Sequence, residues 1–484
     1  MNNSQSDEET PLLPTHGPKA PAAQKRTTLP KLQIAICLLL QVCEPLTSQS
    51  IYPYINQLVS ELDITGGDQR KVGYYAGLIE SLFFATEAMT VLQWSRTSDH
   101  VGRKPILLVG LFGSMLSMLF FGLSRTFWTL VLSRCLTGLL NGNIGVMKSV
   151  MGELTDSTNR AEGFSLLPVV WGFGATMGPL IGGTLSRPHE RFPYAFGGQF
   201  WEKFPYFLPC LVTASYVLIA FLITLGLFKE TVPKRSNCDR RASSEGGQDI
   251  SHPPQEQPLP LRELLVYPVI LSVSNYVALA FLNIAFCALL PLFLAMPLEI
   301  GGLGFDPPKI GYIMGSYGAG SAIFQAIYFA RVVRYFGERK VFIMAMTLFI
   351  PVFLSLPAIN KMAVTFGTQS VAVWLLVVLL LACLALMDMA YGTIFMFITA
   401  SSPNKRSLGA TNGLSQTIVS IARAVGPAFS TSLFAFCVQH NILGGLGVYA
   451  LFACLSVGAL FLATRLPHKV WEEADSGSTI PGDG

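Results

Sequence analysis

Residues 94–105 read WSRTSDHVGRKP, a short charged stretch that separates two long apolar runs. The runs, residues 72–93 and 106–123, each have about the ~20 residues that a helix needs to cross a bilayer. Because the connection is so short, the two helices must be antiparallel neighbours. The charged side chains of the connection must lie at a membrane face, since each would cost about 2.5 to 3.5 kcal/mol at the centre of a span.

Within this stretch, a D-x-x-G-R-K-P pattern is formed by Asp99, Gly102, Arg103, Lys104 and Pro105. The pattern resembles the loop between the second and third spans of the major facilitator superfamily. In that family the loop is a cytosolic latch, whose acidic and basic side chains pair with charges on neighbouring helices and hold one conformation closed. The resemblance implies a latch at Asp99, Gly102, Arg103 and Lys104. The alternative is an ordinary basic loop that only sets the orientation in the membrane.

The composition of the whole chain is typical of a membrane protein. Of its 484 residues, 51% are hydrophobic and only 13% are charged, against about 25% charged in soluble domains. The net charge of +4 gives no indication of nucleic-acid binding, because the positive residues lie in short loops where membrane orientation explains them. The nine cysteines are an odd number without zinc-site spacing, so we predict no disulfide framework and no metal site.

Twelve apolar segments are long enough to span a bilayer, which predicts an all-α membrane protein, and the resemblance implies that it has the major facilitator fold. A polar, Pro-rich segment at 229–262, interpreted as a disordered cytosolic linker, divides the chain into two pseudo-symmetric halves of six spans. The halves are a six-helix bundle at 32–228 and a second at 263–465. The predicted spans are 32–55, 72–93, 106–124, 127–150, 163–185, 206–228, 264–294, 310–332, 341–359, 371–397, 408–437 and 445–464.

Lysine and arginine are unevenly divided between the two faces of the predicted bundle. Roughly 22 of the 33 lie on the face that carries the N-terminus and roughly 8 on the other, which predicts cytosolic termini. The tails, residues 1–31 and 466–484, are predicted to be cytosolic, and the first lacks the features of a signal peptide. Glu8, Leu12 and Leu13 fit an acidic dileucine sorting signal, so a vacuolar or endosomal membrane is the alternative to the plasma membrane.

The two halves repeat each other in sequence, as expected of a duplicated carrier. Gly178-Pro179 in the fifth span is matched by Gly426-Pro427 in the eleventh, six spans later. The basic loop around Gly337, after the eighth span, is an incomplete copy of the loop after the second. It lacks the acidic residue and the proline, which leaves its role as a latch in doubt.

Seven ionisable side chains lie inside predicted spans, where only a partner or a watery cavity makes a charge tolerable. No histidine lies inside a span, so carboxylates must carry any protons that the protein moves. Glu80 and Glu87 are seven residues apart, which places both on one helical face, about 10 Å apart. Alternatively, Glu80 reaches interfacial water and Glu87 pairs with the latch. The seven are Glu44, Glu80, Glu87, Arg134, Lys148, Asp388 and Arg423.

Two of these residues stand in informative local sequences. Glu44 precedes Pro45 about midway along the first span, where proline can open a kink beside a substrate or coupling-ion site. A kink acid satisfied by a neighbouring hydroxyl is the alternative. Arg134, Gly138 and Gly142 are spaced like the fourth-span motif that the family associates with proton coupling. A static buried ion pair is the alternative for Arg134.

The fifth span contains a glycine pattern formed by Gly174, Gly178, Pro179, Gly182 and Gly183. It resembles the signature of drug:proton antiporters within the superfamily, although a serine replaces the glycine expected nine positions before Gly174. We expect these glycines to press the fifth span against its partner at the interface of the halves, while Pro179 bends it. The alternative is generic packing of small residues.

The wider pattern of Glu-Pro, Asn-Gly and Gly-Pro pairs resembles the zinc-induced facilitator-like group and its fungal relatives. The resemblance implies proton-coupled efflux of small amphiphilic organic compounds such as drugs or toxins, by a monomer without a cofactor. A vacuolar or plasma-membrane carrier of a nutrient, organic acid or metal chelate, working by symport or uniport, is the alternative. Motifs of zinc proteases, serine hydrolases and P-loop pumps are absent, so we predict no enzyme. The residues predicted for proton coupling or substrate are Glu44, Glu80, Glu87, Arg134, Asp388 and Arg423.

Overall fold

The computed structural model describes residues 30–155, 167–231, 265–403 and 408–467. Across these residues the chain forms helices and no strand, which confirms the all-α prediction. Most of each predicted tail, most of the predicted linker and the dileucine pattern lie outside the described residues, as does the serine in the fifth-span motif.

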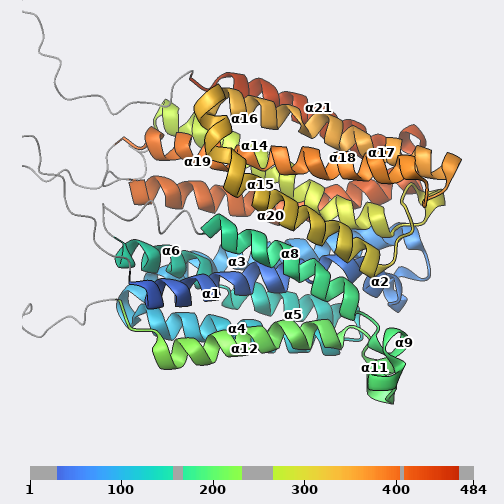
Figure 1. Ribbon diagram of the computed structural model, residues 1–484, viewed down its shortest axis with the longest axis horizontal. Helices are drawn as coiled ribbons and strands as arrows, with labels where there is room; N and C mark the ends of the chain where they lie inside the picture. Colours follow the sequence, from blue (N-terminus) through green and yellow to red (C-terminus); the bar gives the residue numbers. More distant parts are fainter. Residues whose placement is uncertain (1–29, 156–166, 232–264, 404–407, 468–484) are drawn as a thin grey trace, which may run out of the picture.

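Figure 1 shows the helices in two groups that lie side by side, with the N-terminal helices in blue to green and the C-terminal ones in yellow to red. The first group consists of α1 (Lys31–Gln49), α2 (Tyr52–Ser60), α3 (Val72–Val101), α4 (Arg103–Leu123), α5 (Phe127–Leu140), α6 (Asn143–Leu154), α8 (Leu167–Leu185), α9 (Pro188–Arg191), α10 (Pro193–Phe196), α11 (Gln199–Lys203) and α12 (Phe207–Leu227).

The second group consists of α14 (Tyr267–Ala295), α15 (Pro307–Phe336), α16 (Glu338–Thr347), α17 (Phe349–Phe366), α18 (Val371–Met387), α19 (Met389–Ser401), α20 (Leu408–Gln439) and α21 (Gly447–Thr464). Short 3₁₀ turns lie at Asp63–Thr65, Gln69–Lys71, Leu298–Ile300 and Ile442–Gly445. Two ends of the bundle are used as reference points below. The loop end carries α9, α10 and α11, and the latch end carries Gly102 and the end of α6 (Figure 1).

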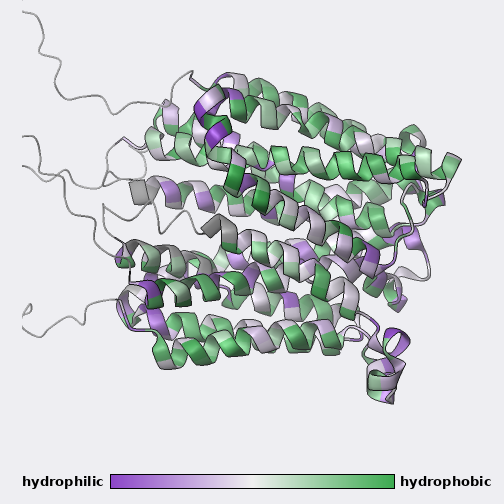
Figure 2. Cartoon of the chain, viewed as in Figure 1, coloured by the Kyte–Doolittle hydropathy of each residue, from purple (hydrophilic) through white to green (hydrophobic). Residues whose placement is uncertain are grey.

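Ten helical segments of the described residues are long and apolar enough to cross a membrane. The helices α8 and α15 occupy the positions of the fifth and eighth predicted spans, so the arrangement is consistent with twelve. Figure 2 shows apolar residues along the lengths of the helices. Leu375, Val378 and Leu379 of α18 are 64%, 61% and 59% exposed, which is suitable for contact with lipid and unfavourable in water.

Several predicted spans are built from two helices each. The helix α1 continues through Pro45 to Gln49, so the proline beside Glu44 does not break the helix, and the chain breaks just before α2. Proline removes one helix hydrogen bond without ending a helix that is packed on all sides. The fourth span divides at Asn141, and the tenth passes from α18 to α19 at Asp388. The acidic residue at a helix junction is therefore Asp388.

The two groups contact each other closely through α3 with α20 and α8 with α15. The backbone N–H of Ala428 donates a 2.8 Å hydrogen bond to Ser81 Oγ. A Cβ added to Gly77 would lie 2.8 Å from the Pro427 carbonyl oxygen, and one added to Gly183 would lie 2.5 Å from a carbonyl of α15. These glycines allow the backbones to approach, and they lie in the parts of α3 and α8 nearer the loop end. The bundle is therefore closed at the loop end.

Candidate functional site

Glu80 lies at the centre of a buried polar cluster in the first group. Tyr52, at the start of α2, donates a short hydrogen bond to Glu80 Oε1, and Arg134 Nη2 lies 3.9 Å from Glu80 Oε2. The Arg134 side chain is 2% exposed, and its guanidinium lies 5.4 and 5.5 Å from the ring centres of Phe83 and Phe121. Glu80 is itself buried, so the alternative in which it reaches interfacial water is wrong.

Glu87, two turns further along α3, accepts a 2.9 Å hydrogen bond from Asn141 Nδ2. Asn141 can reach it because α5 ends there and because α5 packs directly on α3. A Cβ added to Gly138 would collide with Thr86 and with the backbone of α3, and one added to Gly142 would lie 2.5 Å from Trp94. The predicted glycine spacing thus sets the distance between the fourth span and the second.

A small cavity joins these side chains to α1. Its volume of about 20 Å³ is enough for one water molecule. Glu44, Arg134 and Asn141 all contribute to its wall, so the structure brings Glu44 to the same polar region as Glu80 and Glu87. The remaining lining residues are Leu40, Gln41, Cys43, Thr47, Ser48, Phe83, Ser114, Thr137, Asn143 and Met147.

Asp388 forms a comparable cluster in the second group. Its Oδ2 accepts hydrogen bonds from Tyr317 at 2.7 Å and from Ser321 at 2.6 Å, both on α15. Cys287 of α14 lies close enough to interact electrostatically with both Asp388 and Glu80. Each group therefore holds one carboxylate that is hydrogen-bonded to a tyrosine hydroxyl, buried in the case of Glu80 and half-buried in the case of Asp388, and both carboxylates lie near the same cysteine.

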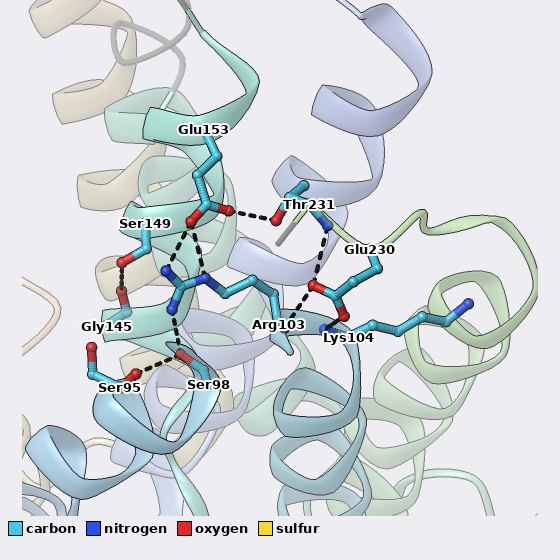
Figure 3. A network of polar contacts seen from close by, with 9 residues as sticks. All are labelled: Ser95, Ser98, Arg103, Lys104, Gly145, Ser149, Glu153, Glu230 and Thr231. Atoms are coloured by element: carbon cyan, nitrogen blue, oxygen red, sulfur yellow. Dashed lines mark hydrogen bonds and ion pairs between the residues drawn. The ribbon is translucent and has the colours of Figure 1, made fainter. Parts of the chain in front are cut away.

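Arg103 connects three segments at the latch end (Figure 3). Its Nη2 lies 2.8 Å from Glu153 Oε1 on α6, and its Nη1 donates to Ser98 Oγ at 2.5 Å on α3. Thr231, beyond the end of α12, donates to Glu153 Oε2 at 2.5 Å. The side chains of Asp99 and Lys148 are outside the described ones. The described side chains of the predicted latch, those of Arg103 and Lys104, connect spans of the first group to one another.

Glu230 caps the start of α4. It accepts hydrogen bonds from the backbone N–H groups of Arg103 at 2.8 Å and Lys104 at 3.0 Å. A carboxylate in this position is stabilised by the unpaired N–H groups and the dipole of the helix. Gly102 has a φ of 114°, and an added Cβ would lie 2.6 Å from Glu230 Oε2. The position therefore requires glycine for both its conformation and its space.

The incomplete copy of the latch loop is placed in the same way in the second group. Gly337 also has a positive φ, of 80°. Arg339 stands two residues after this glycine, as Lys104 does after Gly102, and it donates to the carbonyls of Thr464 and Leu466 at the end of α21. Lys104 donates to the carbonyl that follows α12 at 2.9 Å. Each loop thus holds the end of the last span of its own group, where a cation is favourable.

The fifth-span glycines do not all face the second group, as we had expected. Gly174, Gly178 and Gly182 lie against α1 just after its proline, within the first group. Gly183 and the carbonyl of Pro179 face α15. The expectation that the whole pattern packs at the interface of the halves was therefore wrong for three of its glycines. Residues four apart lie on one face of a helix, so these three glycines pack against the same segment of the chain.

A second ionic cluster fixes the loop end of the first group. Arg187 lies 2.5 Å from Glu61 Oε1 and 2.8 Å from Glu190 Oε1, and Tyr206 donates to Glu61 Oε1 at 2.7 Å. Burial, followed by the Glu61 carboxylate, raises the pKa of Tyr206, so the phenol stays protonated as a donor. The cluster connects α2, α9 and the start of α12. The sequence analysis did not identify it, because it assigned Glu61, Arg187 and Glu190 to loops and Tyr206 to the start of the sixth span.

Comparison with known proteins identifies the fold. A family model described as "Major Facilitator Superfamily" matches residues 37–427. The chain belongs to this superfamily. It is therefore a membrane transporter rather than an enzyme.

This facilitator has similar proteins in several organisms. It is 32% identical to the major facilitator-type transporter psiT2 of Psilocybe cyanescens, over 88% of each chain. It is 27% identical to the multidrug transporter mfsB of Aspergillus fumigatus, over 92% of this chain and 84% of that one. The protein Zinc Induced Facilitator-Like 1 of Arabidopsis thaliana is 26% identical over 85% of each chain. The predicted resemblances to the superfamily, to the zinc-induced facilitator-like group and to its fungal relatives are confirmed.

A solved structure shares the fold of this facilitator. A bacterial homologue of the human lysosomal transporter Spinster, in an inward-facing and unoccupied conformation, matches 90% of this chain and 96% of its own, with a TM-score of 0.63 and 15% identity.

The sequence predicted the charged residues of this facilitator but missed most of their partners. An acid directly after the sixth span was a usable signal for Glu230. The partners that the sequence analysis did not assign are Tyr52, Ser98, Glu153, Glu230, Thr231, Tyr317 and Ser321.

Proposed function

We propose that this facilitator exports small amphiphilic organic compounds, such as drugs or toxins, in exchange for protons. The observation that carries the proposal is a pair of carboxylates, one in each group, namely the buried Glu80 and the half-buried Asp388, each of which accepts a hydrogen bond from a tyrosine hydroxyl. A hydrogen bond to a carboxylate is about twice as strong as one to a neutral acid. Protonation of either residue weakens its bond to tyrosine and removes a buried charge, which changes the stability of the closed conformation.

The remaining polar residues of the first group are proposed to pass the proton between Glu80 and the latch end. Glu44 and Glu87 are reached from Arg134 through the small water-sized cavity and through Asn141. Arg134 interacts with the charged form of Glu80 and competes with the proton for it. The latch formed by Gly102, Arg103 and Lys104 is proposed to stabilise one conformation. The role of Asp99 in it rests on the resemblance alone.

Export is supported by similarity to a protein named as a multidrug transporter. We propose a monomer in the plasma membrane with both termini in the cytosol, so that the latch end is the cytosolic end. Pro179 and Gly183 of the fifth span, which face α15, are proposed to keep the loop end sealed while the substrate is bound from the cytosol. A vacuolar or endosomal membrane is the second possibility, and a fluorescent fusion with protease protection distinguishes the two and reports the side of the termini.

Proteoliposomes that contain pyranine, a pH-sensitive dye, test the coupling. For the unmodified protein, an inward substrate gradient should drive protons out of the vesicles. Conversely, a pH gradient with the acidic side inside the vesicles should make them accumulate substrate. We expect Glu80→Gln and Asp388→Asn to abolish this coupled proton movement, with Glu202→Gln on the exposed α11 as the matched control. Variants that fold and still couple fully would refute the assignment.

The second candidate is a vacuolar or plasma-membrane carrier of a nutrient, organic acid or metal chelate. Similarity to a zinc-induced facilitator-like protein favours it. The same vesicles distinguish the candidates. Protons that move together with the substrate indicate a symporter, and substrate movement without any proton movement indicates a uniporter.

A further inference from the structure

A projecting segment between α8 and α12 carries a dense group of aromatic side chains. We call residues 188–204, which include α9, α10 and α11, the aromatic loop. Figure 1 shows it at the loop end, beyond α12 on the outer side of the first group. The equivalent connection of the second group, between α20 and α21, is much shorter and spans residues 440–446. The aromatic loop is therefore an addition to the plan that the two groups share. Its aromatic residues are Phe192, Tyr194, Phe196, Phe200, Trp201 and Phe204.

The rings of the aromatic loop pack on one another and yet remain accessible. Trp201 lies edge-on to Phe196 and Phe200, with ring centres 4.8 and 5.3 Å away. Tyr194 is fully exposed, and Phe192 and Phe200 are exposed as well. Grouped apolar surface of this kind is unfavourable in water and typical of a site of contact with another apolar surface. The aromatic loop is thus suited to contact something apolar that is not part of the described chain.

The aromatic loop is held firmly to the spans that it connects. Arg187 turns the chain into it with a left-handed φ of 51°, and its backbone N–H donates to the Pro205 carbonyl at 2.8 Å. Arg191 Nη1 donates to the carbonyls of Gly183 at 2.8 Å and Thr184 at 3.1 Å, which belong to the last turn of α8. These carbonyls have no partner within the helix itself. The aromatic loop therefore has a defined position relative to α8 and α12.

The surface of the aromatic loop continues the apolar outer surface of α12. Ile219, Leu222 and Leu225 of α12 are exposed, which in a membrane transporter means contact with lipid. Phe207, the first residue of α12, joins this span to the aromatic loop, since its ring centre lies 5.4 Å from that of Phe200. A lipid-facing surface that follows a span to its end reaches the boundary between hydrocarbon and water, where aromatic side chains are enriched. This continuity favours lipid over a protein as the partner.

We propose that the aromatic loop lies in the membrane–water interface at the loop end and fixes the depth of the first group in the bilayer. Its rings contact the boundary between headgroups and acyl chains. Glu202 and Lys203, exposed on α11, stay among the headgroups, because a charge is costly in hydrocarbon. The equivalent connection of the second group is too short for such a segment, so the first group is the one that is anchored. The inference goes beyond the proposed function, since it holds for any substrate and for either direction of transport.

A fluorescent label on the aromatic loop tests its depth. The fluorophore NBD is attached to Ala195→Cys, an exposed position of α10, in a cysteine-free full chain reconstituted in phosphatidylcholine nanodiscs. Nitroxide lipids that carry the quencher near the headgroup or at the end of the acyl chain report the depth of the label, and iodide reports its exposure to water. We expect the label about 5 to 10 Å within the boundary of headgroups and acyl chains. The nitroxide near the headgroup should therefore quench it strongly, and the other two quenchers weakly.

A second label and two sets of substitutions complete the test. Arg70→Cys, exposed in a polar turn at the same end, is the control label, which iodide should quench and the nitroxide lipids should not. Removing three rings together, by substituting serine for each, should lower lipid quenching at Ala195 and raise iodide quenching. Gln199→Ser, also exposed on α11, is the matched control and should change neither. Size-exclusion profiles show whether each variant folds, and the depth of the unsubstituted loop needs none of them. The three ring substitutions are Phe192→Ser, Tyr194→Ser and Phe200→Ser.

Three results would overturn the inference. If iodide quenches the label at Ala195 as strongly as the label at Arg70, the aromatic loop projects into water. If neither iodide nor the nitroxide lipids reach the label, protein covers the loop, and chemical cross-linking in the same nanodiscs shows whether a second copy of the chain does so. If the label is quenched by lipid to the same extent after the three rings are removed, the rings do not anchor the first group.

Discussion

The close contact between α3 and α20 predicts the effect of a single added side chain on the conformational equilibrium. The substitution is Gly77→Val. A Cβ at this position would collide with Thr431 Oγ1 and lie 2.8 Å from the Pro427 carbonyl oxygen. Real Cβ atoms essentially never approach another heavy atom within 3.0 Å, and a proline carbonyl inside a helix cannot rotate away. The two helices must therefore separate at the loop end.

The size of the effect follows from the cost of overpacking. Inserting methyl groups into a closely packed contact costs about 1 to 3 kcal/mol. Only the conformation in which α3 and α20 touch here bears this cost, so the ratio of loop-end-closed to loop-end-open molecules should fall by about 5 to 150 times. The direction is fixed by the geometry, because the added atoms meet nothing once the helices separate.

The distance between two spin labels, measured on the protein in nanodiscs, reports this ratio of closed to open molecules. Labels at Arg70→Cys and Asn441→Cys, both exposed at the loop end on opposite groups, are placed in a cysteine-free background that transports normally. The unmodified protein should give a short distance, and Gly77→Val should populate a longer one. Gly413→Val is the control, because nothing lies within 4 Å of a Cβ at that position of α20. An unchanged distance distribution in folded Gly77→Val protein would contradict the reasoning.

Three further predictions follow from the polar and packing contacts of the first group. Glu153→Gln removes the charged partner of the latch arginine and should lower the stability of the bundle by about 1 to 2 kcal/mol, measured as a lower melting temperature of the detergent-solubilised protein. Tyr52→Phe deletes the hydroxyl that bonds to Glu80, so proton movement in vesicles should fall although the ring still packs; unchanged coupling would exclude this role. Gly182→Ala collides with the backbone of Ser50, directly after α1, and should cost about 1 to 3 kcal/mol, whereas Gly226→Ala, with open space around it, should cost little; equal melting temperatures would contradict this.

The elements that lipid requires were predictable from the sequence. A span needs about 20 apolar residues whatever it packs against, so its position can be read from a single segment. The loop at 94–105 was equally readable, because its glycine and its charges are set by a tight turn at a membrane face. The course of the chain at Pro45 was less readable, because a proline shows only which hydrogen bond is missing. Whether the helix continues, as α1 does through Pro45, depends on the neighbours that hold both sides in line.

The partners of the charged residues were not predictable for a different reason. Arg103 and Glu230 are 127 residues apart, and Glu80 and Arg134 are 54 apart, so each pair exists only because particular spans pack together. Periodicity places a side chain on a helix face but does not state which helix covers that face. The fifth-span glycines show the same limit, since three of them pack within the first group and Gly183 packs against α15, rather than all at the interface of the halves.

The equivalent contacts of Lys104 and Arg339 indicate where motion is confined. Each holds the end of the sixth span of its own group, so the second, third and sixth spans of a group are tied together at the latch end. The cluster of Arg187, Glu61 and Tyr206 ties the first group at the loop end as well. A group joined at its ends moves as one body, and its displacement must then appear where the groups meet, along α3 with α20 and α8 with α15. Contacts between glycine and backbone occupy these two seams because they can separate and close again without breaking a salt bridge, and this is why one methyl group at Gly77 should act on the whole equilibrium.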